Sequence, residues 1–258
     1  MRLSALTVCF NSAKTIRYTL DSFFSQDYPD KEIVVIDGQS SDGTQKIVEE
    51  YRCDHLKFVS EPDSGMYDAL NKALGMYTGG AFGVLNSDDR YHSTGVLSAI
   101  AEELQKYDMV HGHVNYVNNH EESRILRFWR ATDPPKSGFR SGWMPNHTSF
   151  YVRREVQEET GPFSLEYKIS SDYDWMLRAV ECGKWSLSTL DLVITDMQNG
   201  GASTSGIHRY FRHNIESLRS RRIHLGSGLV DMALLQKPMR KLQQFSGMAA
   251  IWGRNNDK

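Results

Sequence analysis

The sequence predicts an α/β protein with a mainly parallel sheet, helices on both faces of that sheet and a helical extension at its C-terminal end. Two observations predict this class. Over residues 1–107, apolar runs typical of strands alternate with segments in which apolar residues recur at helical spacing. Over residues 206–258, apolar residues recur at helical spacing among basic ones. The composition, 40% hydrophobic and 24% charged in 258 residues, is typical of a globular chain and excludes a disordered one.

Four strand–helix units make up the first half of the chain. The predicted strands cover residues 3–10, 32–37, 56–61 and 81–86, and the predicted helices cover residues 11–26, 44–52, 66–77 and 93–107. Because crossover helices join such strands, the strands are expected to run parallel. Their carboxyl ends then lie together, where folds of this kind bind ligands. The candidate site residues are the polar ones after these strands, namely Asn11, Asp37, Glu61 and residues 86–89.

The pattern changes over residues 108–205. Strands are predicted at 109–117, 124–130, 148–156 and 186–195, the first two antiparallel, and a helix is predicted at 170–183. The glycine-containing loop 199–204 is a candidate for closure over a ligand, or a plain linker. Two amphipathic helices are predicted at 207–224 and 229–245. The sequence therefore predicts one domain over 1–205, with halves at 1–107 and 108–205, and a basic helical extension over 206–258.

Charge and cysteine content exclude several classes of protein. A formal net charge of -2 argues against a nucleic-acid partner, because such domains carry a strong basic excess. The three cysteines, Cys9, Cys53 and Cys182, are far apart and form no CxxC pair, so neither a disulfide framework nor a zinc site is predicted. No apolar run approaches the roughly 20 residues of a membrane span, and the start does not read as a signal peptide. A cytoplasmic location is expected.

The turn after the first strand, CFNSAKT, contains no glycine. It therefore matches neither the dinucleotide-binding pattern nor the P-loop pattern, which argues against a Rossmann dehydrogenase and a P-loop enzyme. If the protein binds a nucleotide, the charge of its phosphates must be neutralised in another way. A divalent cation on carboxylates that follow the strands would do this, because Mg²⁺ and Mn²⁺ prefer oxygen ligands and bind through few carboxylates plus substrate phosphates.

Three runs carry a resemblance to a known family: LTVCFNSAKTIRYTLDSFFSQDYPDKEIVVIDGQSSDGTQKIVEEY, SEPDSGMYDALNKALGMYTGGAFGVLNSDD and NHTSFYVRREVQEETGPFSLEYKISSDYDWMLR. They resemble, in order and spacing, the family 2 glycosyltransferases of the GT-A fold, and among these the short bacterial-type members of surface polysaccharide assembly. The resemblance implies a nucleotide-sugar-binding half at 1–107 and an acceptor-side half at 108–205. It also implies Mn²⁺ or Mg²⁺, and inverting transfer of one hexose-type sugar from a UDP-linked donor to a glycan or lipid-linked acceptor. The QxxRW motif of processive relatives is absent.

The resemblance also assigns roles to individual residues. Asp37 would contact the nucleobase and Asp88 would bind the metal, whereas Asn86 stands where the commoner motif has an aspartate. Asp172 would be the general base, with Ser171 replacing the family's glutamate and Asp174 as the second candidate. The donor-binding residues implied are Thr7, Phe10, Asn11, Asp37, Asp63, Lys72, Asn86, Ser87 and Asp88, and those on the acceptor or diphosphate side are His147 and Trp143.

Each assignment has a structural alternative. Asp88 and Asp89 could form a solvated turn before a helix, where carboxylates are favourable, and Asp89 is expected to be structural. Asp37 could hold an Asx-turn, and Asp172 could cap a helix. Lys72 could lie on a solvated helix face. His147 and the other polar candidates could equally be satisfied structural groups.

Two other functions fit a nucleotide-binding α/β sheet. One is a nucleotidyltransferase that makes a nucleotide sugar, and the other is a non-catalytic nucleotide-sugar-binding module. The basic extension also has two interpretations. It could lie on the anionic inner face of a membrane, or it could pack against the catalytic domain or a second subunit of a homo-oligomer.

Overall fold

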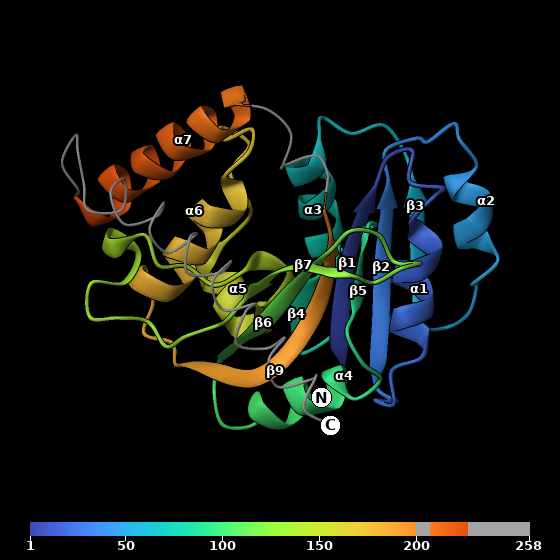
Figure 1. Ribbon diagram of the computed structural model, residues 1–258, viewed down its shortest axis with the longest axis horizontal. Helices are drawn as coiled ribbons and strands as arrows, with labels where there is room; N and C mark the ends of the chain where they lie inside the picture. The colour runs from blue at the N-terminus through green and yellow to red at the C-terminus, as the bar shows by residue number, and fades with distance from the viewer. Residues whose placement is uncertain (200–206, 227–258) are drawn as a thin grey trace.

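The computed structural model describes residues 1–199 and 207–226. The predicted helix 229–245 and nearly all of the loop 199–204 lie outside the described residues. Figure 1 shows one sheet flanked by helices. Its strands are β1 (Leu3–Cys9), β2 (Lys31–Asp37), β3 (Leu56–Ser60), β4 (Ala81–Val84), β5 (Asp89–Tyr91), β6 (Met109–Val117), β7 (Ile125–Trp129), β8 (Tyr151–Arg153) and β9 (Leu187–Gln198). The helices are α1 (Ile16–Phe24), α2 (Thr44–Glu49), α3 (Met66–Leu74), α4 (Val96–Glu103), α5 (Arg154–Thr160), α6 (Ser171–Leu177) and α7 (Ile207–Leu225).

The sheet has the order β3-β2-β1-β4-β8-β6-β9-β5, and β7 pairs with β6. The four strands β3, β2, β1 and β4 are all parallel, as the repeated strand–helix units predict. The second half adds antiparallel pairs, β4 with β8, β8 with β6, β6 with β7 and β5 with β9, together with one parallel pair, β6 with β9. The predicted α/β class, with its change of pattern after residue 108, is confirmed.

Alternation of side chains along the strands produces a core on each face of the sheet. Leu6, Val8 and Phe82 point to the face covered by α3, α5 and α6. Ala5 and Val35 point to the opposite face, which α1, α2 and α4 cover. Because both faces are covered, every residue of β1 and β2 is buried, and their sequences are nearly continuous apolar runs. The prediction of helices on both faces is confirmed.

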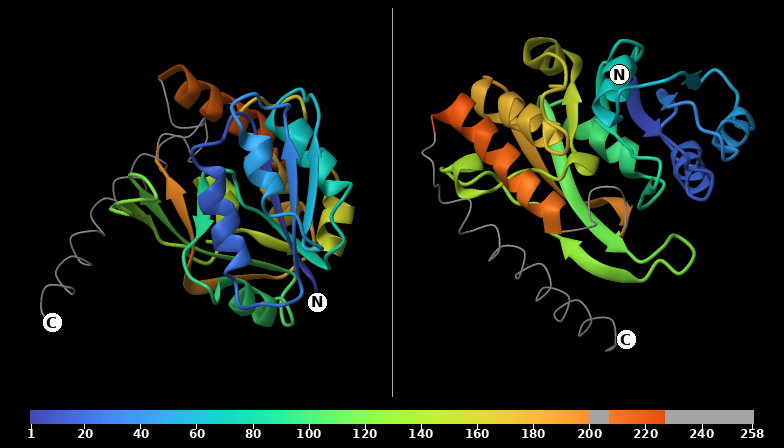
Figure 2. Two further views of the ribbon diagram at one scale, coloured as in Figure 1. Left: turned by 90° about the vertical axis from the view of Figure 1, so that its right-hand side faces the viewer. Right: turned by 90° about the horizontal axis from the view of Figure 1, so that it is seen from above.

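α7 lies alongside α6, as the right-hand view of Figure 2 shows. Ser217, Ser220 and Arg221 form the buried side of this helix, and Arg221 donates a hydrogen bond of 2.7 Å to the hydroxyl of Tyr173 on α6. The inner side of α7 therefore packs against the domain over residues 1–205, which is one of the two interpretations of the basic extension. Among the described residues, no helix is long and apolar enough to cross a membrane.

Several elements differ from the sequence prediction, among them the predicted strand 148–156, of which only β8 is a strand because α5 begins at Arg154. Asp89–Tyr91 was expected in a turn but forms β5, because its backbone pairs with Thr195–Met197 of β9. For the same reason β9 continues to Gln198, beyond the predicted end at residue 195. The predicted helix 170–183 is α6 followed by a π-helical turn, η3 (Arg178–Cys182). The loop 132–146 contains the short 3₁₀ turn η1 (Gly138–Ser141), and η2 (His147–Ser149) precedes β8.

Candidate active site

Hydrogen bonds hold together the segments that follow β1, β2 and β4. Asn11 adopts a left-handed conformation with φ of 52°, its N–H donates to Ser40 Oγ at 2.7 Å, and its Oδ1 accepts from the Ser41 N–H at 3.0 Å. Thr7 is buried and donates to the Leu85 carbonyl at 2.7 Å. Thr7 and Asn11 therefore stabilise the segments at the carboxyl end of the sheet. A direct contact of either residue with a nucleotide-sugar donor stays a prediction.

Asp37 ends β2 in a fully buried position. Its Oδ2 accepts from the Ser40 N–H at 2.9 Å and from Ser60 Oγ at 2.6 Å, while its Oδ1 accepts from Ser40 Oγ and, at 3.5 Å, from the Cys9 thiol. Burial, and then the Asp37 charge, raise the pKa of Cys9, so this thiol stays protonated. The nucleobase contact predicted for Asp37 would require one of these hydroxyl groups to turn away, and it stays a prediction.

Phe10 and Asp63 approach each other above Gly38. A methyl group added to Gly38 would lie 2.6 Å from Asp63 Oδ2 and 3.3 Å from Phe10 Cδ2, so only glycine leaves this approach open. The Phe10 ring is 65% exposed although it directly follows a buried strand. The exposed Phe10 ring can stack on a planar group, and the half-buried Asp63 carboxylate beside it can accept hydrogen bonds from the N–H groups of that planar group. This is the part of the predicted donor site most suited to a nucleobase.

Lys72 lies on α3 and reaches back to the segment after β3. Its Nζ is 2.8 Å from Glu61 Oε1 and donates to the Pro62 carbonyl at 2.7 Å. The structure thus brings Lys72 to the carboxyl end of the sheet, already paired with a carboxylate. A phosphate contact by Lys72 stays a prediction and would compete with Glu61.

The two adjacent acids after β4 have different surroundings. Asp89 is buried, and its oxygens accept from Asn86 Nδ2 at 2.9 Å and from the Gln198 N–H at 3.3 Å. Burial, and then the neighbouring Asp88 charge, raise the pKa of Asp89 well above its usual value. Asp88 is half-buried, and burial raises its pKa too, yet within the described residues no side chain donates a hydrogen bond to its carboxyl group. Asp89 therefore supports the turn, whereas the Asp88 carboxyl group has no side-chain donor among these residues, and its predicted metal-binding role stays a prediction.

A chain of polar side chains connects the segment after β4 to α6. Asn86 Nδ2 lies 3.3 Å from His147 Nε2, and His147 Nδ1 lies 3.5 Å from Asp172 Oδ2. The Asp172 side chain is 21% exposed, and its Oδ1 lies 3.1 Å from the Tyr67 hydroxyl of α3. Three predicted site residues, Asn86, His147 and Asp172, thus meet in space although they are far apart in sequence.

Asp174, the second candidate for the general base, points away from the polar side chains of Asn86, His147 and Asp172. It is buried and accepts from Arg178 Nε at 2.9 Å, from Ser220 Oγ at 2.8 Å and from His224 Nε2 at 3.1 Å. Residues two apart on a helix face different directions, and here one acid faces the site and the other faces α7. Asp174 is therefore placed to join α6 to α7 rather than to accept a proton from a substrate.

Trp143 and Ser87 are less open than a ligand-binding role suggests. Trp143 is 4% exposed, donates its indole N–H to the Thr132 carbonyl at 3.1 Å and packs edge-on against Phe139. The role of Trp143 on the acceptor side stays a prediction. Ser87 Oγ lies 2.9 Å from Ser12 Oγ, which joins the segment after β4 to that after β1.

A small cavity of about 30 Å³ borders the polar chain. Asn86, His147 and Asp172 contribute polar groups, and the remaining walls are mostly aromatic or aliphatic. Such surroundings lower the local dielectric constant and strengthen interactions between charges. Within residues 1–199 and 207–226, no group of three or more His, Cys, Asp or Glu side chains could hold a metal ion by itself. A cation at Asp88 would therefore depend on further oxygens from a ligand such as a diphosphate.

Sequence reasoning missed Tyr67 and His120. Tyr67 occurs in the stretch EPDSGMYDALNK, but its contact with Asp172 spans 105 residues and leaves no local pattern. His120 Nε2 lies 2.8 Å from the Asp88 carbonyl oxygen and so helps to orient this turn. The loop before β7 that carries His120 has no sequence signal of its own.

Residues 4–161 match the family model described as Glycosyl transferase family 2. The match covers more than half of the chain, which belongs to this family and is a glycosyltransferase. It is 26% identical over 215 residues to a PGL/p-HBAD biosynthesis glycosyltransferase of Mycobacterium bovis (strain BCG / Pasteur 1173P2), covering 81% of each chain. It is also 25% identical over 188 residues to the glycosyltransferase AglE of Haloferax volcanii, covering 70% of this chain and 62% of that protein.

Solved structures show the same fold. S. aureus TarS 1-349 in complex with UDP-GlcNAc aligns with a TM-score of 0.68 at 21% identity, covering 90% of this chain and 69% of that one. The mannosyltransferase PcManGT from Pyrobaculum calidifontis, in complex with GDP-Man and Mn²⁺, aligns with a TM-score of 0.63 at 21% identity, covering 97% and 71%. These likenesses confirm the predicted GT-A-like fold.

Proposed function

We propose that this glycosyltransferase transfers one hexose-type sugar from a nucleotide-sugar donor to a hydroxyl group of a glycan or lipid-linked acceptor, with inversion at the anomeric carbon. One observation carries the proposal. Asp88, whose carboxylate has no side-chain donor among the described residues, and the part-exposed Asp172 lie at one end of the sheet, where His147 contacts both Asp172 and Asn86, the residue two positions before Asp88. Surface polysaccharide assembly is the proposed context, supported by the biosynthetic name of the mycobacterial relative.

The donor would lie across the carboxyl ends of β1, β2 and β4. Phe10 and Asp63 offer a ring and a carboxylate to the nucleobase, above Gly38. Asp88 fits a divalent cation, because it is a half-buried carboxylate whose oxygens no side chain in the described residues occupies. Mn²⁺ or Mg²⁺, when bound there, would neutralise the diphosphate and favour its departure. A UDP-linked donor is proposed, and the UDP-GlcNAc complex of the TarS neighbour supports it. Because PcManGT is in complex with GDP-Man, the choice between UDP and GDP is tested by the donor screen below.

Asp172 is proposed as the general base. Its carboxylate accepts the proton of the acceptor hydroxyl while that oxygen bonds to the anomeric carbon. The bond from the anomeric carbon to the phosphate oxygen breaks, and its electron pair leaves with the nucleoside diphosphate. His147 Nδ1, at 3.5 Å from Asp172 Oδ2, helps to hold the carboxylate in place, and the Tyr67 hydroxyl, at 3.1 Å from Oδ1, shares its one proton between this carboxylate and the Ile169 carbonyl. One displacement inverts the configuration, whereas retention by double displacement needs a second carboxylate as nucleophile.

A donor screen tests the binding part of the proposal. Thermal unfolding is measured with UDP-, GDP- and dTDP-sugars, each with Mn²⁺ or with EDTA. A ligand that binds the folded state raises the apparent stability, so a UDP-sugar with Mn²⁺ should raise Tm, and EDTA should abolish the rise. A rise in Tm with GDP-sugars alone would show that the donor nucleotide is GDP and not UDP. No rise with any donor would contradict the assigned site.

The configuration of the product tests the chemistry. With the donor found in the screen and a panel of saccharide and lipid-linked acceptors, NMR of the product gives the anomeric configuration. The proposal predicts a configuration opposite to that of the donor. A product with the donor's own configuration would overturn the single displacement.

Peripheral membrane contact is proposed for the outward side of α7. Ile215 and Ile223 are 67% and 59% exposed on this side, where Arg212 and Arg222 are also exposed. Apolar side chains interleaved with arginines suit an anionic lipid surface, which would bring a lipid-linked acceptor near α6. Sedimentation with vesicles tests this contact. Binding should require anionic lipid and fall in the double variant Ile215→Ser, Ile223→Ser, and equal binding to neutral vesicles would contradict it.

A further inference from the structure

Glu216 of α7 binds the backbone of the segment that leads into α6. Its carboxylate oxygens accept hydrogen bonds from three consecutive backbone N–H groups, those of Lys168 at 3.3 Å, Ile169 at 3.0 Å and Ser170 at 3.0 Å. Hydrogen bonds from N–H donors to an ionised carboxylate are among the stronger ones in proteins. A single side chain of α7 therefore fixes the path of three residues directly before the helix that carries Asp172.

The same segment is held from its other side by α3. The Tyr67 hydroxyl donates to the Ile169 carbonyl at 2.6 Å, so the backbone of Ile169 is bonded through its N–H to α7 and through its carbonyl to α3. Ser170, the residue before α6, adds a contact of 2.8 Å between its Oγ and His213 Nδ1 of α7. Because Asp172 lies in the first turn of α6, the direction of this segment sets the position of its carboxylate.

The side chain of the N-cap residue does not fix the start of α6. Ser170 is the N-cap residue, yet its side chain makes no capping hydrogen bond to α6. The first N–H groups of a helix lack partners within the helix, so the ends of helices are held by what surrounds them. At α6, the surrounding group with the most hydrogen bonds to the preceding backbone is Glu216.

We propose that Glu216 is a positioning residue for Asp172, so that α7 is part of the catalytic architecture. Glu216 acts through the backbone of residues 168–170 and is not predicted to touch the substrate. This inference depends on the proposed function, because it concerns the placement of Asp172 as the base. A misplacement of about 1 Å in a catalytic group can cost about 100-fold in rate, so the expected effect is on turnover rather than on donor binding.

The test compares Glu216→Ala and Glu216→Gln with the control Glu166→Ala. Glu166 is an exposed carboxylate beside the same helix, paired with Arg219 and not bonded to residues 168–170. For Glu216→Ala, kcat is expected to fall about 10- to 100-fold, with the KM for the donor and the donor-induced rise in Tm unchanged. Glu216→Gln keeps one acceptor oxygen and should lose less, and it also serves if the alanine variant does not fold. Unchanged kcat in both Glu216 variants would overturn the proposal.

A double-mutant cycle separates positioning from general stabilisation. The residual rate of Asp172→Asn, followed with radiolabelled donor, should show little further loss when Glu216→Ala is added. The same fold-loss in both backgrounds would mean that Glu216 acts independently of Asp172, and the proposal would be wrong. The two levels of the account fail differently. Full activity of Asp172→Asn contradicts the proposed function, whereas an inactive Asp172→Asn beside a fully active Glu216→Ala contradicts only the role of Glu216.

Discussion

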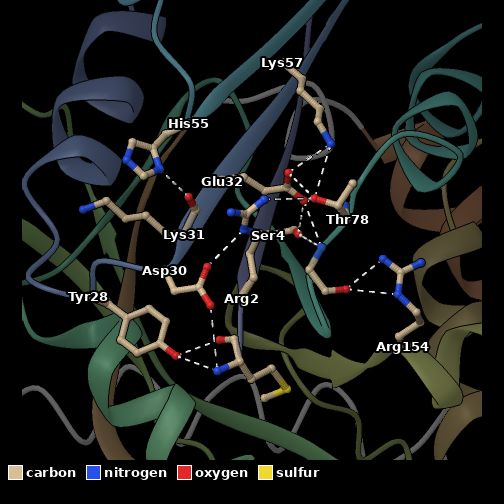
Figure 3. Close-up of polar contacts among 12 residues, drawn as sticks. Arg2, Ser4, Tyr28, Asp30, Lys31, Glu32, His55, Lys57, Thr78 and Arg154 are labelled. Atoms are coloured by element: carbon tan, nitrogen blue, oxygen red, sulfur yellow. Dashed lines mark hydrogen bonds and ion pairs between the residues drawn. The ribbon is translucent and has the colours of Figure 1, made fainter.

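Glu32, at the amino end of the parallel strands, and the pair Asp88 and Asp172, at their carboxyl end, have opposite surroundings. At the amino end, Glu32 is 2% exposed, and several donors of the protein surround its carboxylate. Its oxygens accept from Ser4 Oγ at 2.7 Å, from the Gly79 N–H at 3.0 Å and from both the N–H and the hydroxyl of Thr78, and they lie 3.1 Å from Lys57 Nζ (Figure 3). These contacts leave Glu32 no spare capacity for a ligand.

At the carboxyl end, Asp88 and Asp172 keep unused hydrogen-bonding capacity. Asp88 receives no side-chain hydrogen bond from the described residues, and Asp172 has a hydroxyl at 3.1 Å and an imidazole nitrogen at 3.5 Å. Buried polar groups are normally paired within the protein, so groups left short of partners are candidates for binding a ligand. The comparison teaches that the fold itself saturates Glu32, whereas Asp88 and Asp172 remain available for the binding and chemistry proposed above.

The largest expected effect is on turnover at the carboxyl end. Asp172→Asn keeps the shape of the side chain but removes the group that accepts the proton, so kcat should fall about 100- to 10,000-fold. The Tm should stay within a few degrees of the wild-type value. Asp54→Asn, at an exposed position after α2, is the matched control and should keep full activity. Initial rates at saturating donor provide the measurement.

The next effect concerns metal-dependent binding. Asp88→Asn removes the charge predicted to bind the cation. The apparent affinity for Mn²⁺ should fall by at least about 10-fold, because even residues that only orient a metal ligand typically cost this much when they are mutated. Titration of the initial rate with Mn²⁺ measures this. Equal Mn²⁺ dependence in the variant and the wild type would show that Asp88 is not a ligand.

At the amino end, the expected effect is on stability. Glu32→Gln replaces an acceptor oxygen with an NH₂ group that faces donors, which should cost about 1–3 kcal/mol of unfolding free energy. Urea denaturation provides the measurement. The kcat and the donor KM should stay at wild-type values, because Glu32 lies at the opposite end of β2 from the site. A loss of kcat without a loss of stability would break the division between the two ends.

Glu32 also predicts how stability depends on acid. Although burial opposes its ionisation, hydrogen bonds from Thr78 and Ser4 and the contact with Lys57 lower its pKa to about 2. Since this is below the pKa of an unfolded chain, roughly 4.3, the ionised form contributes stability at neutral pH. That contribution is lost as the pH falls from the unfolded value towards about 2. Acid denaturation followed by circular dichroism should be flatter over this range in Glu32→Gln.

The smallest expected effect concerns His92, after β5. A hydrogen bond to the buried Asp196, at 2.9 Å, raises the pKa of His92. The charged form is therefore favoured in the folded state, and its contribution is complete below the unfolded pKa and lost as the pH rises through the folded pKa. Because His92 is 41% exposed, the change should be below about 1 kcal/mol. In His92→Asn, stability should vary less between pH 6 and 8.

Local sequence patterns predicted the parallel half because strands such as β2 at Lys31–Asp37 contain a continuous apolar run, here Ile33–Ile36, that a polar turn follows. They missed β5, since a three-residue strand forms only by pairing with β9 about 100 residues later. Of the candidate site, single residues such as Asp88 and Asp172 could be selected from their motifs. The contacts that Asp172 makes with Tyr67 and His147 could not be predicted from motifs, because the fold brings these distant residues together.

The same limit applies to the helices. The spacing of Asp172 and Asp174 indicates that they face different directions on α6. The sequence does not show that Asp174 is buried against Ser220 and His224 of α7. The predicted extension over 206–258 identified α7 from its amphipathic pattern, but the hydrogen bonds from Glu216 to the segment before α6 leave no signal in either stretch.

The central claim is that Asp88 binds the donor with its metal and Asp172 performs the chemistry. Calorimetric binding of the donor and Mn²⁺, measured beside turnover in Asp88→Asn and Asp172→Asn, tests this division most directly. The account predicts that Asp172→Asn binds the donor as the wild type does but scarcely transfers the sugar, while Asp88→Asn loses Mn²⁺-dependent binding. Wild-type transfer by Asp172→Asn, or unchanged Mn²⁺-dependent binding by Asp88→Asn, would contradict it.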